Sequence, residues 1–365
     1  MPPPGNFSFR RSGISILSIV CFTVFAAVAS ADIASQIDPL FSDYDRPGVP
    51  GASVAIFQDD KILYEKGYGL ANLEANESAI PQTNYRLASL TKQFTAMAVL
   101  QLEAQGKLSF DETLADIFTG FPSYGKQITV RHLLGHVGGL HDYEDLIPDS
   151  QTTQVSDADV LEMMKSQSDT YFTPGSEYRY SNTGYVMLSN IVELRSGQSF
   201  ADYVEAHIFG ALGMSGSRIY RTQGFQIDHR AYGYTGSGSN YDLTDQSVTS
   251  ATLGDGGVYT SVHDYFLWDE ALYTERLVPA DLLQQAFTSG TLNNGEKTGY
   301  GFGWEVGTYQ GIPCISHTGS TIGFRTAVQR FPTKHFSVVV LVNRAGASPW
   351  DTASAIVDRL LFNRK

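Results

Sequence analysis

The amino-acid sequence predicts a mixed α and β fold, in which both ends of the chain build one strand-rich lobe and the middle forms an inserted helical lobe. Runs of β-branched and other apolar residues, bounded by turn residues, occur near the start and again near the end of the chain. Between them, apolar residues recur at helical spacing. The chain has 365 residues, of which 42% are hydrophobic, and this is enough to bury a substantial core.

The first 31 residues have the pattern of a secretory signal peptide. Arg10 and Arg11 precede an apolar run, Ile14–Val28, which is followed by Ala29-Ser30-Ala31. A charged start, a short apolar stretch and an A-x-A cleavage site are typical of such signals. The run is shorter than the roughly 20 apolar residues that a spanning helix needs. We therefore expect an exported protein, periplasmic or secreted, without stable membrane insertion after cleavage.

The segment after the expected cleavage site contains a hairpin and then a long helix. An amphipathic stretch at Ile33–Tyr44 precedes the small and β-branched residues of Ala52–Gln58. Two aspartates then form a turn into Lys61–Gly67, which predicts a β-hairpin. Apolar residues at helical spacing in Leu90–Gln105, followed by Gly106, predict a helix that ends at this glycine.

Helices and loops dominate the middle of the chain, and strands return near its end. The helical middle reaches about residue 250 and has a Gly/Ser-rich interruption at Gly233–Asn240. Later strands and a final helix are predicted at Gly303–Gly307, Cys314–His317, Arg325–Phe331, Phe336–Val342 and Thr352–Phe362. We therefore expect one domain over residues 32–365. Its α/β lobe would take about 32–100 and 251–365, and its α lobe about 101–250.

Charge and cysteine content exclude several classes of protein. Lysine and arginine total 25 against 38 acidic residues, so the net charge is −13. This argues against a nucleic-acid-binding protein, because such proteins neutralise phosphates with basic side chains. Cleavage of residues 1–31 removes Cys21 and leaves Cys314 as the only thiol. An exported protein with one cysteine has neither an internal disulfide nor a cysteine metal cluster.

The segment Ser89-Leu90-Thr91-Lys92, at the start of the predicted helix, can carry nucleophilic chemistry. Residues three apart share a helix face, which places the Lys92 ammonium beside the Ser89 hydroxyl. A desolvated lysine can accept the proton of a serine, and a helix N-terminus can stabilise a developing oxyanion. The ordinary alternative is a capping serine and a solvated lysine.

Two later segments suit the same chemistry. Tyr180-Ser181-Asn182 lies on a loop that enters a helix. The phenol of Tyr180 can act as a general base or proton conduit, or it can simply pack beside a helix cap. His317-Thr318-Gly319 ends a predicted strand, where small residues let a substrate backbone approach and pair with the strand. Here the ordinary alternative is a strand-end turn.

In this order, the three segments resemble the motifs of the penicillin-recognising serine hydrolases, which are S-x-x-K, then Y-x-N, then K-T-G or H-T-G. The resemblance is strongest to the branch of class C β-lactamases and serine D-alanyl-D-alanine carboxypeptidases, in which the middle motif begins with tyrosine. Tyr85–Ala88, Ile128–Leu134 and Gly254–Tyr259 reinforce it, and it extends over roughly residues 48–344.

The resemblance implies a β-lactamase/DD-peptidase-like α+β fold, with an antiparallel sheet flanked by helices, an inserted all-α lobe and an active site between the lobes. It implies a serine hydrolase that forms an acyl-enzyme on amide or ester bonds without metal or cofactor. The implied substrate is a β-lactam, a D-Ala-D-Ala peptide or an ester. By resemblance, Ser89 is the nucleophile, Lys92 and Tyr180 share the proton transfers, and Asn182 contacts the substrate amide. The backbone N–H groups of Ser89 and Ser320 would form the oxyanion hole.

The third motif differs from that of most β-lactamases, because His317 stands where a lysine is usual. An unperturbed histidine is mostly neutral at pH 7, so we expect weak recognition of a substrate carboxylate. We also expect that recognition to improve as His317 protonates between about pH 8 and 5.5. Thr318, Gly319 and Ser320 are implied to contact the substrate, and Arg325 on the next strand could supply the missing charge.

Three other interpretations carry less weight. His132, His136 and His141 suggest a zinc site, with the first two four residues apart on a predicted helix, but no H-E-x-x-H motif accompanies them. The chain lacks the G-x-S-x-G motif of an α/β-hydrolase. A noncatalytic penicillin-binding or cell-wall-sensing module of the same fold remains the alternative, although the complete set of catalytic residue types argues against it.

Overall fold

The computed structural model describes residues 32–221, 226–238 and 240–363. The predicted signal peptide, residues 1–31, lies outside the described residues. Among the helices that the structure describes, none combines the length and the apolar character needed to cross a membrane.

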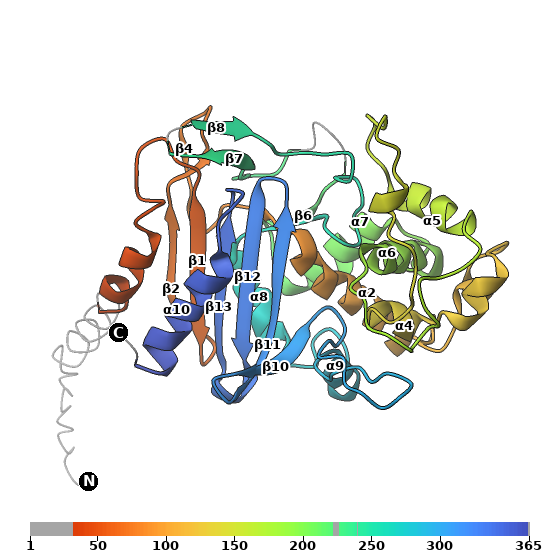
Figure 1. The fold of residues 1–365 in the computed structure, drawn as a ribbon. Helices are drawn as coiled ribbons and strands as arrows, with labels where there is room; N and C mark the ends of the chain where they lie inside the picture. Colours follow the sequence, from red (N-terminus) through yellow and green to blue (C-terminus); the bar gives the residue numbers. More distant parts are fainter. Residues whose placement is uncertain (1–31, 222–225, 239, 364–365) are drawn as a thin grey trace, which may run out of the picture.

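A six-stranded antiparallel sheet is the framework of the molecule and joins the two ends of the chain (Figure 1). Its order is β10-β11-β12-β13-β1-β2. The strands are β1 (Ala52–Gln58), β2 (Lys61–Tyr68), β10 (Glu305–Tyr309), β11 (Ile312–Thr321), β12 (Phe324–Phe331) and β13 (Phe336–Val342). β1 pairs with β13 from Ala52↔Val342 to Gln58↔Phe336. The sheet therefore confirms that both ends of the chain build one strand-rich layer.

Alternation along the central strands gives the sheet two buried faces. In β13, Val338, Val340 and Val342 pack with α10 (Pro349–Leu361), whereas Val339 and Leu341 belong to the core that includes α8 (Val262–Ala271). Helices α10 and α8 thus cover opposite faces (Figure 1). Because side chains alternate along a strand, a continuous apolar run is the pattern of a strand buried on both sides.

The segment between β2 and β10 is mainly helical. Besides α8, its helices are α2 (Lys92–Ala104), α3 (Leu114–Ile117), α4 (Val130–Leu134), α5 (Asp157–Lys165), α6 (Asn182–Ser196), α7 (Phe200–Val204) and α9 (Ala280–Ala286). Helix α6 packs against α2, α4, α5 and α7. The contact between α2 and α6 matters most, because the first two motifs lie at the N-terminal ends of these helices.

Short strands and helical turns complete the chain. The strands are β3 (Leu70–Asn72), β4 (Glu77–Ser78), β5 (Tyr85–Arg86), β6 (Arg218–Ile219), β7 (Tyr234–Ser237), β8 (Asn240–Leu243) and β9 (Val258–Thr260). The turns are η1 (Asp38–Phe41), η2 (Ala88–Thr91), η3 (Ser123–Gln127), η4 (Glu144–Leu146), η5 (Glu205–Gly210) and η6 (Pro332–Lys334).

The structure corrects three local predictions. The Gly/Ser-rich interruption contributes to a hairpin, in which β7 pairs with β8. Helix α4 ends at Leu134, and His136 has a φ of 57°, so His132 and His136 do not share a helix. Strand β11 continues past His317 to Thr321, because its pairing with β12 extends to Thr321↔Phe324.

Candidate active site

Ser89 and Lys92 meet where η2 continues into α2. Ser89 lies within η2 and Lys92 is the first residue of α2. The Nζ of Lys92 lies 3.1 Å from the Oγ of Ser89, as the three-residue spacing predicts. Nζ also donates to Oδ1 of Asn182 at 2.9 Å and to the backbone carbonyl of Asp255 at 3.1 Å. The lysine side chain is therefore held in one position, with its nitrogen beside the serine hydroxyl.

The surroundings of Lys92 make its neutral form more accessible than that of a solvated lysine. The residue is 0% exposed, and this burial lowers the pKa of its ammonium to about 8. The nearby carboxylates of Asp255, Glu144 and Asp142 act in the opposite direction and hold the pKa from falling further. An amine with a pKa near the working pH can both accept and return a proton, which is the requirement for a general base.

Tyr180 lies against the same ammonium. It precedes α6 by two residues, and the Nζ of Lys92 is 4.9 Å from the centroid of its ring. Although 38% of the residue is exposed, burial around its hydroxyl raises the pKa of Tyr180, and a hydrogen bond with Ser89 opposes that rise. The phenol is therefore protonated at neutral pH.

Asn182 connects Lys92 to an acidic side chain. As the first residue of α6, it follows the capping residue Ser181, whose hydroxyl accepts a hydrogen bond from the Gly184 N–H at 3.1 Å. The Nδ2 of Asn182 donates to Oε1 of Glu144 at 3.2 Å. Burial raises the pKa of Glu144. Both ends of the Asn182 amide are therefore held, because its oxygen accepts from Lys92 and its nitrogen donates to Glu144.

His317 lies in β11 and makes two hydrogen bonds that define its tautomer. Its Nδ1 is 2.6 Å from the carbonyl oxygen of Thr318, which can only accept, so we assign the proton to Nδ1. Its Nε2 then accepts from the hydroxyl of Tyr300 at 3.0 Å. The imidazole has no N–H left for a substrate in this arrangement.

The charge of His317 also differs from the prediction. The residue is 2% exposed, and burial, together with the charge of Lys92, lowers the pKa of its imidazole to about 3. The expectation that His317 protonates between pH 8 and 5.5 is therefore wrong. The ordinary pKa of histidine applies to a solvated ring, whereas the ring of His317 is buried and packs against Tyr300.

Gly319 is explained by packing. A Cβ at this position would lie 2.3 Å from the carbonyl oxygen of Leu87 and 2.2 Å from Oγ1 of Thr326. Only glycine lets β11 lie this close to η2, which carries Ser89. The flanking side chains of Thr318 and Ser320 are exposed.

Arg325 lies opposite Ser320 in the β11–β12 pairing. Its Nη1 donates to the carbonyl oxygens of Thr321, Ile322 and Phe324, at 3.2, 3.0 and 2.7 Å. One end of the guanidinium therefore closes the turn between the two strands.

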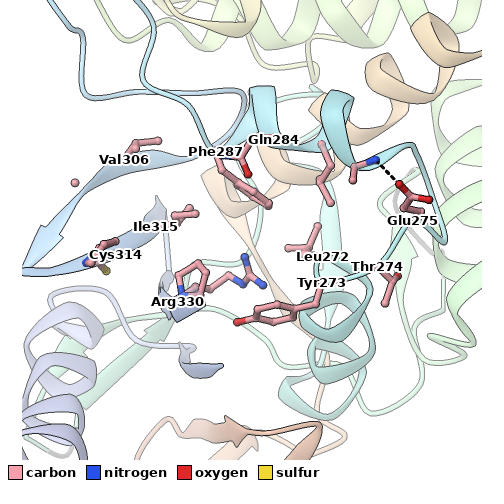
Figure 2. Close-up of a pocket in the computed structure, with 15 residues that line it drawn as sticks. Leu272, Tyr273, Thr274, Glu275, Gln284, Phe287, Val306, Cys314, Ile315 and Arg330 are labelled. Carbon is pink, nitrogen blue, oxygen red and sulfur yellow. Dashed lines mark hydrogen bonds between the residues drawn. The ribbon is translucent and has the colours of Figure 1, made fainter. Parts of the chain in front are cut away.

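A cavity of about 50 Å³ lies beside Ser89. It is lined by Arg86, Ala88, Ser89, Tyr143, Glu144, Asn182, Thr249, Thr252, Asp255, Gly256, Ser320 and Thr321. A larger cavity of about 430 Å³ lies between α9 and strands β10 and β11 (Figure 2). None of the motif residues lines it, and its buried Arg330 is paired with Asp269. The small cavity, and not the larger one, contains the nucleophile candidate.

The sequence did not predict several contacts around this site. The hydroxyl of Tyr143 donates to Oδ2 of Asp255 at 3.0 Å, and burial raises the pKa of that carboxyl. Tyr300 holds His317, and the ring of His136 lies 4.3 Å from that of Tyr180. Gly254–Tyr259 already matched the family pattern, so that segment was the one available signal for Asp255.

The three histidines considered for zinc make separate contacts. His132 accepts from the Thr129 N–H through Nδ1, at 3.2 Å. His136 accepts from the Ser181 N–H at 3.1 Å, whereas His141 contacts Asp169 at 2.8 Å. Their ring nitrogens do not converge on one point.

The sheet with its helical insertion, together with a serine–lysine pair at one helix start and a tyrosine–asparagine pair at another, defines a serine hydrolase of the β-lactamase fold. The family model described as Beta-lactamase matches residues 37–360. The chain therefore belongs to the Beta-lactamase family.

Individual relatives agree with this assignment. Penicillin-binding protein 4* of Bacillus subtilis (strain 168) is 33% identical over 311 residues, which cover 80% of this chain and 68% of the relative. A D-aminopeptidase of Gluconobacter oxydans (strain 621H) is 27% identical over 327 residues, covering 86% of this chain but only 59% of that protein. The octameric penicillin-binding protein homologue of Pyrococcus abyssi superposes with a TM-score of 0.76 at 27% identity, over 92% of this chain and 78% of that one.

Proposed function

We propose that Ser89 is the acylated nucleophile of this hydrolase and that Lys92 is its general base. The observation that carries the proposal is the 3.1 Å contact between Nζ and Oγ, in surroundings that lower the pKa of Lys92 to about 8. About one lysine in ten is then neutral at pH 7. The neutral amine accepts the Oγ proton as Oγ bonds to the substrate carbonyl carbon.

Tyr180 is proposed as the group that returns this proton. Its pKa is raised, so it acts as a neutral phenol between Lys92 and the leaving group rather than as a phenolate base. The proton removed from Ser89 reaches the departing nitrogen or oxygen, the bond from that atom to the carbonyl carbon breaks, and the acyl-enzyme remains. Water then attacks the ester, and the same groups act in reverse.

The backbone N–H groups of Ser89 and Ser320 are proposed to form the oxyanion hole. Both residues line the small cavity, because β11 packs against η2 across Gly319. Two N–H groups from separate elements, held by packing, need little reorganisation when charge develops on the carbonyl oxygen.

We propose substrates that have no carboxylate next to His317: esters, and amides or short peptides of amino acids, ahead of β-lactams. Support comes from the imidazole, which is neutral and has both nitrogens engaged. The relative named D-aminopeptidase supports amide substrates with D-configured residues. Arg325 is the cation available for substrates that do carry a carboxylate, through the guanidinium nitrogens that the turn does not use.

The finer assignments are proposals of the same kind. We propose membership in the class C β-lactamase and DD-peptidase branch, on the tyrosine that begins the second motif. We propose export from the signal-peptide pattern of residues 1–31.

A substrate panel tests the proposal. The purified protein is assayed with a p-nitrophenyl acetate ester, D-alanine p-nitroanilide, a D-Ala-D-Ala peptide and nitrocefin, beside Ser89→Ala and the control Ser123→Ala, which changes an exposed serine in η3. We expect turnover that is lost in Ser89→Ala and kept in the control. Mass spectrometry of trapped enzyme should place the acyl group on the peptide with Ser89.

Two outcomes would contradict the assignment. Activity of Ser89→Ala within a few-fold of the wild-type rate would mean that another nucleophile exists. Labelling of Ser89 by a fluorescent penicillin without turnover of any substrate would favour the noncatalytic binding module.

A further inference from the structure

Two turns and the end of helix α8 meet at the end of the sheet that is remote from Ser89. Asp60 belongs to the turn between β1 and β2, Glu270 lies near the end of α8, and His335 precedes β13. The backbone N–H of Asp59 donates to the carbonyl of His335 at 3.1 Å, which fixes the two turns to each other. The candidate active site lies at the opposite end of these strands, near Ser320.

The three side chains place one ligand atom each around a common point. The Nε2 of His335 is 3.3 Å from Oδ1 of Asp60 and 3.4 Å from Oε1 of Glu270. All three ligand atoms lie within 4.8 Å of one another. In a tetrahedral zinc site with bonds of about 2.0–2.1 Å, neighbouring ligand atoms are about 3.3–3.4 Å apart. Two of the three separations therefore already have the required length.

Two of these atoms have partners only within the cluster. The Nε2 of His335 and the Oε1 of Glu270 are buried, and beyond the ion-pair contacts of the cluster neither has a hydrogen-bond partner among the described residues. The carboxylate oxygens of Asp60 and Glu270 lie within 4.8 Å of each other. Two carboxylates this close repel each other, and a divalent cation between them relieves the repulsion.

One side of the cluster faces solvent, and protein packs against the other side. The side chain of Asp60 is 77% exposed, so an ion reaches the cluster from solvent. On the inner side, the ring of Tyr273, which also lines the larger cavity (Figure 2), lies with its centroid 3.9 Å from that of His335. This contact restricts the orientation of the imidazole.

We propose that Asp60, Glu270 and His335 bind a divalent transition-metal ion, with Zn²⁺ the best match, and that this ion fastens the β1–β2 turn, the end of α8 and the start of β13 together. One imidazole nitrogen and two carboxylate oxygens form a donor set that zinc accepts, and the fourth position faces solvent. The site is structural, because it lies away from the nucleophile.

Calorimetry with ZnCl₂ tests the proposal directly. Untagged protein, stripped with EDTA and dialysed, is titrated as wild type and as Asp60→Asn, Glu270→Gln and His335→Gln. The control is His263→Gln, which removes an imidazole paired at 3.0 Å with one carboxylate, that of Glu65. We expect each of the three cluster variants to bind one Zn²⁺ fewer per chain than wild type and the control.

Two further measurements separate a metal site from an ion pair. Co²⁺ added to the stripped wild type should give the visible absorption of a tetrahedral ion, which Asp60→Asn should lose. Zinc should raise the melting temperature of wild type and of the control by the same amount, and that of Asp60→Asn by less. Asp60 lies on an exposed turn, so this variant keeps the fold even if the more buried changes do not.

Two results would overturn the proposal. One is a wild type that binds no Zn²⁺, which would leave only a histidine–carboxylate ion pair. The other is zinc binding that all three cluster variants retain. Ester hydrolysis should be unchanged by zinc and by Asp60→Asn, so the metal proposal and the proposed function can fail independently.

Discussion

Replacement of Asp255 by asparagine should move the pH dependence of acylation, because the carboxylate of Asp255 raises the pKa of the proposed base, Lys92. In the wild-type protein that pKa is about 8, and only the neutral amine accepts the Ser89 proton. The rate of acylation should then be about tenfold below its plateau at pH 7 and about a hundredfold below it at pH 6. Removal of the Asp255 charge lowers the pKa of Lys92, so the rate at pH 6–7 should rise toward the plateau.

His317 and Tyr180 do not titrate within this pH window. The pKa of His317 is about 3, and that of Tyr180 is raised above its ordinary value near 10. Asparagine keeps an oxygen that can accept from Tyr143, and the backbone carbonyl that accepts from Lys92 is unchanged. The shift therefore reports on charge more than on lost contacts.

The assay is stopped-flow acylation by p-nitrophenyl acetate between pH 5.5 and 9.5 at constant ionic strength. The ester has no titrating group in this range, and Asp281→Asn, an exposed aspartate on α9, is the matched control. A wild-type rate that is flat from pH 6 to 9 would refute Lys92 as the base. An acid limb that Asp255→Asn leaves in place would refute the electrostatic reasoning.

Three further predictions follow from buried groups. Burial raises the pKa of Asp157 to about 8, so the stabilising contribution of this carboxyl is complete below its ordinary pKa of 3.8 and is lost as the pH rises to 8. Asp157→Asn should therefore raise the free energy of unfolding, measured in urea at pH 8, by about 1–4 kcal/mol. The gain should be smaller at pH 5. Gly319→Ala should lower the free energy of unfolding by about 1–3 kcal/mol and displace β11 from η2, because its Cβ would clash with Leu87. The measurements are the melting temperature, which should fall, and the rate of acylation, which should decrease. Unchanged values would show that small shifts remove the clash. Because His317 stays neutral between pH 5.5 and 8, its titration should not change the ratio of kcat/KM for nitrocefin to kcat/KM for the ester over this range. His317→Lys should raise this ratio by about 10–100-fold, because an ammonium at this position can pair with the carboxylate of nitrocefin.

Local pattern was enough to predict the central strands. β1 and β13 have the predicted bounds, since each is a buried apolar run between turn residues. β11 is longer than predicted because its last residues are small and polar, and only their pairing with β12 makes them a strand. The β7–β8 hairpin was not predicted for a similar reason, because its glycines and serines have low strand propensity.

The same distinction between local pattern and long-range contacts applies to the site. The proximity of Ser89 and Lys92 depends on three residues of one helical turn, so spacing predicts it. The contacts of Lys92 with Asp255 and of Tyr143 with Asp255 join residues 163 and 112 positions apart, which no local pattern encodes. The neutral state of His317 likewise depends on burial by distant elements.

The sheet, and with it the complete active site, cannot form until β1 has paired with β13. The strands are separated by nearly the whole domain, yet they are neighbours in the interior of the sheet, between β12 and β2. During synthesis, β1 has no lasting partner on that side until residues 336–342 have left the ribosome. Such long-range pairing is the kind of topology that folds slowly. A nascent chain that ends before Phe336 thus has every group proposed to react, Ser89, Lys92 and Tyr180, and also β11, but it lacks β13, the strand that joins β11 and β12 to β1. Truncation before Phe336 should yield an aggregation-prone chain with two open strand edges and no hydrolase activity.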